Sequence, residues 1–518
     1  MSPPKLELRR RPAPRRAPAI AAEEASAQIA VVDIGSNSVR LIIYRREGRA
    51  FWPIFNEKLL AGLGRGLPET GRLSEEGVEM ALRTLRRFEM ITRARGVADI
   101  VAFATAAVRD AEDGEEFVRR IREECGIVVN VLSGSEEGRL SALGAIAGGA
   151  DSAGMVGDLG GSSLELCPLQ GGAPQGGVTL KLGPLAVLGD GQQDMKSLRK
   201  TIDAALKTAG GLFDEAGSDF YAVGGSWRNL ARVDMSLRDY PLHVLHHYEM
   251  TRAQARKTSE FVASQSADSL GAMPDVSSRR VPLLPYAALL LECILDHGKF
   301  DRVVISAYGV REGALFDRMS EETRARDPLL AGAEAFARRL APNSNVGEAL
   351  AEWVEPVFAS GDVLDPAREA LLRRAGAILA DMGSAMHPDH RAELVADQVL
   401  YSPIAGMDHC ERAYLATALF HRYGGPSDPP ADFAPRDLAA PEVLERARGV
   451  GLALRLGCVI SGRSPDLLAL TRLEIEDGRL VLTVRKAGEP LATDQAEKRL
   501  KQLASALNLS PEIVTPGG

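Results

Sequence analysis

The stretch Val31-Val32-Asp33-Ile34-Gly35-Ser36-Asn37-Ser38-Val39-Arg40-Leu41 decides the fold. In it an apolar run ends at an aspartate, a short turn of glycine and polar residues follows, and a second apolar run begins. Residues 155–166 repeat this plan, with Asp158 at the end of the first run and residues 160–163 in the turn. This pattern predicts two strands joined by a tight turn. We therefore expect a duplicated α/β unit whose two turns face one another across a cleft.

The chain divides into two parts of different character. Apolar strands and amphipathic helices alternate from residue 28 to about Asp317, which is the pattern of α/β domains. Beyond Asp317 the spacing is helical, and only residues 469–484 indicate a β-hairpin, because Glu476-Asp477-Gly478-Arg479 supplies a turn. We therefore expect a disordered basic leader, two α/β domains, a helical domain and a small α+β domain, at residues 1–27, 28–150, 151–317, 318–445 and 446–518.

Composition and charge exclude several classes of partner. The 518 residues are 45% hydrophobic and 25% charged, as in ordinary globular proteins. A net charge of -8 argues against a surface built entirely for nucleic acid or anionic membrane. No apolar run approaches the roughly 18–20 residues that a transmembrane helix needs. The sequence therefore predicts no nucleic-acid partner and no membrane partner.

Cysteine usage and the N-terminal residues indicate a compartment. The five cysteines are scattered and form no Cys-x-x-Cys pair, which favours a reducing compartment without structural zinc. The N-terminus is rich in proline, alanine and arginine, and it lacks the apolar core of a signal peptide. We expect a cytoplasmic protein whose leader is either a solvated segment or an arm that attracts polyanions.

Two helices are predicted around the first unit. Ser74 is a plausible N-cap for a helix whose apolar residues recur at helical spacing. A strand over residues 127–132 should precede a second helix, with Ser135 as its expected N-cap. Glu136 and Glu137 would then lie in the first turn, where negative charge suits the helix dipole. This second helix begins shortly before the second turn.

The two turns are suited to hold a phosphate chain. Glycine lets the backbone approach an anion closely, successive N–H groups converge on its oxygens, and serine and asparagine add donors. One such turn also occurs in ordinary hairpins, but this chain carries two, and a third Gly-Gly-Ser turn follows a further strand. An aspartate at a strand end can hold Mg²⁺, directly or through water, and so neutralise phosphate charge.

These considerations predict a set of binding residues. Asp33 and Asp158 are the predicted ligands of Mg²⁺ or another divalent cation. Lys181 and Arg228 are weaker candidates for phosphate contacts. The predicted phosphate-binding residues are Gly35, Ser36, Asn37, Ser38, Gly160, Gly161, Ser162, Ser163, Gly225 and Ser226.

Five stretches carry a family resemblance, in this order along the chain: residues 33–38, 104–109, 133–140, 158–163 and 306–313. Together they resemble the exopolyphosphatase and guanosine pentaphosphate phosphohydrolase (Ppx/GppA) family. That family lies within the superfamily of acetate and sugar kinases, heat-shock ATPases and actin. The resemblance implies duplicated actin-like, ribonuclease H-like domains with an active-site cleft between them, followed by a mainly helical C-terminal region.

The resemblance also implies catalytic residues for hydrolysis of a terminal phosphoanhydride. Glu137 matches the catalytic glutamate, a general base that positions and deprotonates the attacking water. Its neighbour Glu136 is the competing candidate. Arg109 matches the arginine that grips the phosphate, a task suited to a planar guanidinium. Gly138 stands where the family usually has alanine, and Leu159 replaces the commoner isoleucine.

The C-terminal region resembles a degenerate metal-dependent phosphohydrolase domain. Enzymes of the His-Asp type need a histidine and aspartate pair plus ligands from other helices. Here Ala380 stands before Asp381, where such a pair would have its histidine. We therefore expect residues 318–445 to lack the metal. By resemblance, the region should mediate homodimer formation and provide a basic channel for polyphosphate.

The sequence indicates an exopolyphosphatase that releases orthophosphate from the end of inorganic polyphosphate with the help of Mg²⁺. Guanosine pentaphosphate 5′-phosphohydrolase is the nearest alternative, because the same site could cleave either anhydride. A non-catalytic sensor of polyphosphate or nucleotide and a polyphosphate-dependent kinase are further alternatives. The glutamate at a helix start before the second turn resembles the phosphohydrolases rather than the kinases.

Overall fold

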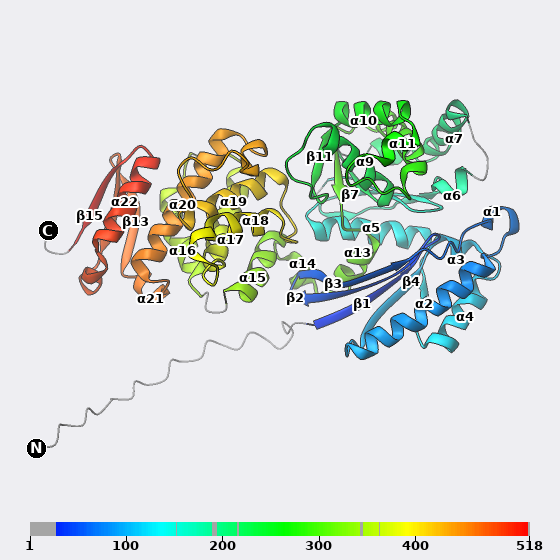
Figure 1. Ribbon diagram of the computed structural model, residues 1–518, viewed down its shortest axis with the longest axis horizontal. Helices are drawn as coiled ribbons and strands as arrows, with labels where there is room; N and C mark the ends of the chain where they lie inside the picture. The colour runs from blue at the N-terminus through cyan, green and yellow to red at the C-terminus, as the bar shows by residue number, and fades with distance from the viewer. Residues whose placement is uncertain are drawn as a thin grey trace, which may run out of the picture.

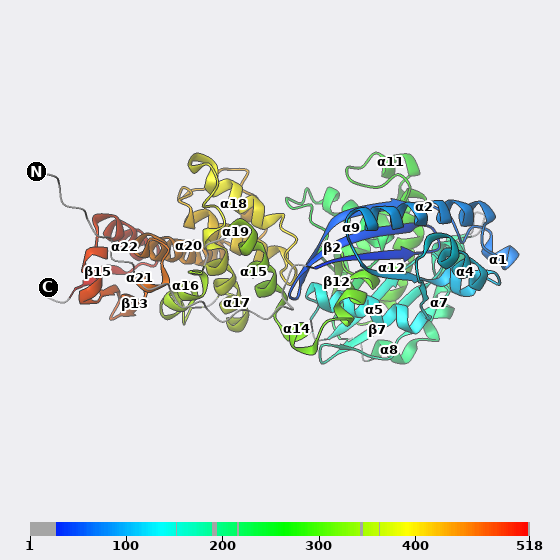
Figure 2. The same ribbon diagram turned by 90° about the horizontal axis from the view of Figure 1, so that it is seen from below.

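The computed structural model describes residues 27–151, 153–188, 194–214, 217–341, 345–361 and 363–515. Residues 1–26 of the expected leader lie outside this range. Figure 1 shows two α/β domains at one end of an elongated molecule, a helical region next to them, and a small unit with three strands at the other end. The same order along the long axis is seen after a quarter turn (Figure 2).

The first sheet has five strands in the order β3-β2-β1-β4-β5. Strand β1 pairs antiparallel with β2 and parallel with β4, so the quoted turn joins the two central strands β1 and β2. The strands are β1 (Ala27–Ile34), β2 (Val39–Glu47), β3 (Ala50–Leu59), β4 (Asp99–Ala104) and β5 (Asn130–Val131).

The second sheet repeats this plan. Strand β6 pairs antiparallel with β7 across the second turn and parallel with β10, which in turn pairs parallel with β12. The strands are β6 (Gly154–Leu159), β7 (Leu164–Gln170), β8 (Ala173–Pro174), β9 (Val178–Leu180), β10 (Asp219–Val223), β11 (Tyr248–Thr251) and β12 (Arg302–Ser306). The expected duplicated α/β architecture is therefore confirmed.

Helices α5 (Gly134–Gly148) and α13 (Val310–Asp317) lie between the two sheets. Apolar residues of α5 pack on both sheets, and apolar residues of α13 pack on the first. The helices approach closely because glycines face the contact: a Cβ at Gly144 would lie 2.1 Å from the Gly309 carbonyl oxygen, and one at Gly313 would lie 1.7 Å from that of Leu140. This contact sets the position of one sheet against the other.

Most of the other helices lie on the outer faces of the sheets, and α1 lies beyond the strand ends (Figure 1). In the first domain they are α1 (Leu67–Thr70), α2 (Glu75–Ala94), α3 (Ala106–Asp110) and α4 (Gly114–Cys125). In the second they are α6 (Pro184–Val187), α7 (Met195–Lys207), α8 (Gly210–Asp214), α9 (Gly225–Leu237), α10 (Arg252–Ser264), α11 (Ala267–Gly271) and α12 (Leu284–His297). The cap expected at Ser74 is confirmed, since its hydroxyl accepts from the Gly77 N–H at 3.3 Å.

The structure corrects two local predictions around α5. Its N-cap is Ser133, whose hydroxyl accepts from the Glu136 N–H at 3.2 Å, and the expected cap Ser135 lies inside the first turn. Ser133 has extended backbone geometry, so the helix begins directly after it. The strand expected over residues 127–132 pairs only at Asn130–Val131.

The C-terminal half is mainly helical, as expected. Its helices are α14 (Glu321–Ala325), α15 (Pro328–Leu340), α16 (Gly347–Val354), α17 (Pro366–Ile378), α18 (Arg391–Leu400), α19 (His409–Arg422), α20 (Pro441–Ser461), α21 (Pro465–Leu468) and α22 (Asp494–Ala506). One apolar core runs from α15 to α22, and the domain boundary expected at residues 445–446 falls inside α20.

The last segment contains the expected hairpin, formed by β13 (Thr471–Glu476) and β14 (Arg479–Val484). A third strand, β15 (Ser510–Val514), pairs parallel with β14 and was not predicted. No helix in the described part of the chain is long and apolar enough to cross a membrane.

Candidate active site

The two turns face one another, as expected, and they have the same internal geometry. In the first, the Gly35 N–H donates to the Ser38 carbonyl at 3.0 Å, and in the second the Gly160 N–H donates to the Ser163 carbonyl at 3.0 Å. The Ser162 hydroxyl donates to the Ser36 hydroxyl at 3.0 Å. The turns of the two domains therefore meet directly.

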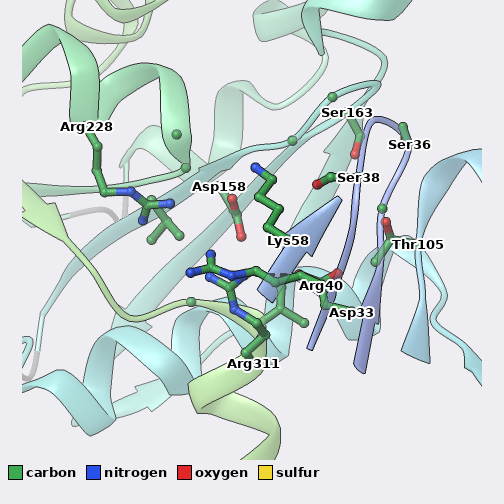
Figure 3. A pocket seen from close by; sticks show the side chains of 18 of the residues that line it. Asp33, Ser36, Ser38, Arg40, Lys58, Thr105, Asp158, Ser163, Arg228 and Arg311 are labelled. Carbon is green, nitrogen blue, oxygen red and sulfur yellow. Dashed lines mark hydrogen bonds and ion pairs between the residues drawn. The ribbon is translucent and has the colours of Figure 1, made fainter. Parts of the chain in front are cut away.

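A cavity of about 370 Å³ opens between these turns (Figure 3). Asn37, Ser162, Ser226 and Arg109 are not among its lining residues, and Ser226 is buried within the first turn of α9. Most of the predicted site residues line it: Asp33, Gly35, Ser36, Ser38, Glu137, Asp158, Gly160, Gly161, Ser163 and Gly225.

Glu137 is a buried carboxylate in the first turn of α5. Its side chain accepts a hydrogen bond from the Arg109 guanidinium at 3.1 Å, so Arg109 orients it from outside the cavity. Burial, and next the negative charge of Asp158, raises the pKa of Glu137 to about 7. A carboxylate with this pKa can accept a proton near neutral pH.

Glu165 is a second buried acid, and sequence reasoning missed it. It lies opposite Asp158 in the β6–β7 ladder and is 1% exposed. Its carboxylate oxygens have no hydrogen bond of ordinary geometry among the described residues. Burial, and next the charge of Glu137, raises its pKa well above the usual range, with a small opposing effect from the Ser163 hydroxyl. The pairing of the two strands that flank the second turn could have revealed Glu165. In this pairing Glu165 lies directly opposite Asp158, so the two side chains are on the same face of the sheet.

Asp33 and Asp158 stand at the ends of β1 and β6. Asp158 accepts from the Ser141 hydroxyl at 2.6 Å, and Asp33 pairs with Arg311 at 3.3 Å. Desolvation raises the pKa of both carboxyls. No three histidine, cysteine or acidic side chains of the described residues converge to form a complete metal site. Two carboxylates that face one cavity nevertheless suit Mg²⁺, which usually takes one or two protein carboxylates and completes its shell with water and phosphate.

A group of cations lines the other side of the cavity, and most of them were not predicted. Figure 3 shows Arg40, Lys58, Arg228 and Arg311 pointing toward the same space. The pKa of Lys58 is lowered to about 8, mainly by burial and secondly by the positive charge of Arg280. The pKa of Arg228 is lowered to about 10, mainly by burial and secondly by the positive charge of Arg311.

Burial is the larger cause of these lowered pKa values, and repulsion between the neighbouring cations adds to it. An anion in the cavity would relieve the repulsion, so the cluster favours a polyanionic ligand. Lys181 and Arg228 were predicted as further phosphate contacts. Arg228 lines the cavity, whereas Lys181 is exposed and does not line it.

Asp381, His387, Asp389 and the three histidines of residues 243–247 do not line this cavity. Asp381 pairs with Arg463 at 2.9 Å. His387 and Asp389 lie at the surface, 3.8 Å apart. The three histidines of residues 243–247 separate: His243 pairs with Asp275 near the surface, while His246 and His247 are directed at the carbonyl of Gly148.

The two similar sheets, with the turns meeting between them, define a protein of the actin-like fold. The model of the Ppx/GppA phosphatase family matches residues 41–322, and that of the exopolyphosphatase C-terminal domain matches residues 329–511. The chain therefore belongs to the Ppx/GppA phosphatase family, a family of hydrolases. The resemblance drawn from the five sequence stretches is confirmed.

Similar proteins carry different names. Exopolyphosphatase 1 of Mycobacterium tuberculosis is 28% identical over 307 residues, covering 57% of this chain and 89% of that protein. The guanosine-5'-triphosphate,3'-diphosphate pyrophosphatase of Vibrio campbellii is 23% identical over 470 residues, covering 88% of this chain and 91% of that protein. A crystal structure of an exopolyphosphatase from Cytophaga hutchinsonii shares the fold, with a TM-score of 0.52, 21% identity, and coverage of 57% of this chain and 99% of that one.

Proposed function

We propose that the protein is an exopolyphosphatase that hydrolyses the terminal phosphoanhydride of inorganic polyphosphate and releases orthophosphate. The observation that carries this proposal is the buried Glu137, whose pKa is about 7, in a cavity shared by two turns rich in glycine and serine and a group of cations. A phosphate chain needs such cations along its length, and hydrolysis needs a base for water at one end.

Each group has a distinct task in this proposal. The terminal phosphate lies against the glycines and serines of the two turns, whose N–H and O–H groups donate to its oxygens. Glu137 orients the attacking water and takes its proton, a contribution that is typically about 10²–10⁴-fold in rate. Arg109 holds the Glu137 carboxylate at 3.1 Å and so fixes the direction of attack.

The remaining charges stabilise the phosphate chain. Lys58, Arg40 and Arg311 would bind the oxygens of the leaving phosphates, where negative charge grows as the bond breaks. Asp33 and Asp158 would hold Mg²⁺ against the chain. When bound, the ion neutralises phosphate charge.

Hydrolysis of guanosine pentaphosphate is a second candidate with its own support. The relative from Vibrio campbellii is named for a guanosine nucleotide, and its similarity extends over 88% of this chain. The catalytic groups would act in the same way on the 5′ end of that nucleotide.

We also propose that the protein forms a homodimer, which light scattering on the purified protein would test.

Parallel assays of phosphate release test this proposal. Long-chain polyphosphate and guanosine pentaphosphate are compared at equal concentration, with Mg²⁺ and after its removal by chelator. We expect faster release from polyphosphate and loss of release after chelation, restored by added Mg²⁺. A strong preference for the nucleotide would overturn the choice of substrate, and undiminished activity after chelation would overturn the role of the ion.

A further inference from the structure

Ser141 is a buried polar residue in an otherwise apolar part of helix α5. It is 1% exposed, and the other residues from Leu140 to Ala145 are leucine, alanine and glycine. A buried hydroxyl lowers stability unless it forms a hydrogen bond, and a serine inside a helix usually bonds to the carbonyl four residues earlier. The hydroxyl of Ser141 instead donates to the Oδ2 atom of Asp158 at 2.6 Å. It is therefore directed at a predicted cation ligand of the second domain.

The contact between Ser141 and Asp158 lies at the edge of the catalytic cavity. Asp158 lines the cavity (Figure 3), whereas Ser141 does not. The backbone of Gly309 lies close to the contact, since a Cβ at Gly309 would be 3.8 Å from both the Asp158 Oδ2 atom and the Ser141 Oγ atom. In the described part of the chain, Ser141 is the only side chain that donates a hydrogen bond to Asp158. Loss of its hydroxyl would therefore leave the Asp158 side chain without its donor.

The same helix carries the predicted base. Glu137 and Ser141 are four residues apart in α5, so they lie on the same face of the helix, one turn apart. Glu137 lines the cavity, and Ser141 holds a carboxylate that also lines it. Helix α5 therefore sets the position of the base and the orientation of Asp158 together. A cation held by a misoriented Asp158 would displace the phosphate from the water at Glu137.

We infer that Ser141 is a positioning residue for the cation: by holding Oδ2 of Asp158, it fixes the carboxylate so that Oδ1 is left for the metal. The inference rests on the proposed role of Asp158 as a ligand of Mg²⁺. Hydrogen-bond partners of metal ligands orient those ligands, and their loss typically lowers metal affinity or activity by about 10–100-fold. Ser141 follows directly after the stretch 133–140 that carries the family resemblance, so the resemblance assigns it no role.

Binding of Mn²⁺ in place of Mg²⁺ tests the inference. Electron paramagnetic resonance of the free ion measures its binding to the whole protein without substrate or turnover. We expect Ser141→Ala, which removes only the hydroxyl, to weaken Mn²⁺ binding about tenfold. Ser141→Thr keeps a hydroxyl on the same carbon and should restore most of the affinity. The Mg²⁺ concentration for half-maximal phosphate release should rise in Ser141→Ala by a similar factor.

Ser259→Ala is the matched control for the loss of a buried helical hydroxyl. Ser259 in α10 is also 1% exposed, but its hydroxyl has no hydrogen-bond partner among the residues that the structure describes. Its removal should leave Mn²⁺ affinity unchanged. An equal loss of affinity in Ser141→Ala and Ser259→Ala would overturn the inference.

Asp158→Asn separates the inference from the proposed function. It tests the metal site itself and should weaken Mn²⁺ binding at least as much as Ser141→Ala. Wild-type affinity in Ser141→Ala, together with weakened binding in Asp158→Asn, would overturn the inference alone. Unchanged binding in Asp158→Asn would overturn both the inference and the proposed role of Asp158. The choice between polyphosphate and nucleotide as substrate affects none of these outcomes.

Discussion

Glu137 and Lys58 face the same cavity with pKa values displaced in opposite directions. Burial raises the pKa of Glu137 to about 7 and lowers that of Lys58 to about 8. Between these values Glu137 is ionised and can act as a base, while Lys58 is still protonated and can bind phosphate. We therefore expect the highest activity in a narrow pH interval near about 7.5, where activity falls on the acid side as Glu137 is protonated and on the alkaline side as Lys58 loses its proton.

The alkaline limb can be assigned with Lys58→Arg. Arginine stays charged throughout this range, so the variant should keep phosphate binding at high pH. We expect the ratio of kcat/KM for the wild type to that for the variant to be constant below about pH 7 and to fall up to tenfold per pH unit above about 8. The substrate's own titration cancels in the ratio. A ratio that stays constant from pH 6.5 to 9.5 would contradict the role of Lys58.

At the residue scale the sequence reveals the groups that belong to local patterns. Asp33, Asp158 and Glu137 each stand at a strand end or helix start next to a glycine-rich turn, and the cavity contains all three. Lys58 and Arg280 could not be found this way, because isolated cations in a strand and a loop have no characteristic spacing. Only the packing of the domains brings them to one cavity.

The contact of α5 with α13 is the element on which the position of the cleft depends. An alanine at Gly313 would place Cβ 1.7 Å from a backbone oxygen of α5, so the helices would have to separate. We expect Gly313→Ala to lower the free energy of unfolding by at least about 1–3 kcal/mol, measured by urea denaturation.

A second glycine provides the matched control for this change. A Cβ at Gly211 in α8 meets no described atom within 4 Å. Gly211→Ala should therefore be neutral or raise stability by about 0.5–1 kcal/mol. Equal effects of the two substitutions would show that helix propensity, rather than the close approach of α5 and α13, accounts for the result.

Secondary structure was predictable where a segment has a strong pattern of its own. Helix α2 and the β13–β14 hairpin have clear apolar periodicity and clear end signals, and both occur as expected. Strand β15 was missed because a short segment after a helix becomes a strand only through its partner β14. Ser133 and Ser135 are equally good caps by composition, and the path of the chain out of β5 decides between them.

In the whole molecule, buried histidines join the helical region to the α/β pair. His409 accepts from the Tyr240 hydroxyl at 2.9 Å and approaches the carbonyl of His246 at 3.3 Å. Burial lowers the pKa of His409 to about 3, that of His247 to about 4, and that of His246 well below its usual range. All three are therefore neutral in the folded protein at neutral pH.

This junction predicts loss of stability in mild acid. The unfolded chain takes up a proton on each histidine below about pH 6.5, and the folded chain does so only near its lowered pKa. Each histidine should therefore reduce the free energy of unfolding by up to about 1.4 kcal/mol per pH unit as the pH falls from about 6 toward 4.

Urea denaturation from pH 7.5 to 5 measures this loss. His409→Asn cannot take up the proton, so below about pH 6 its stability should fall less steeply than that of the wild type, by up to about 1.4 kcal/mol per pH unit. His390→Asn, at an exposed position, is the matched control and should follow the wild type. A His409→Asn slope equal to that of the wild type would contradict the account of the junction.

The most direct measurement of the central claim is phosphate release from long-chain polyphosphate by the wild type, Glu137→Gln and Glu136→Gln. The neighbours differ in position: Glu137 is buried in the cavity, whereas Glu136 pairs with Arg139 outside it. We expect Glu137→Gln to lower kcat by about 10²–10⁴-fold and Glu136→Gln to change it only a few-fold. Retention of most of the activity by Glu137→Gln, or an equal loss in both variants, would contradict the assignment of Glu137 as the base.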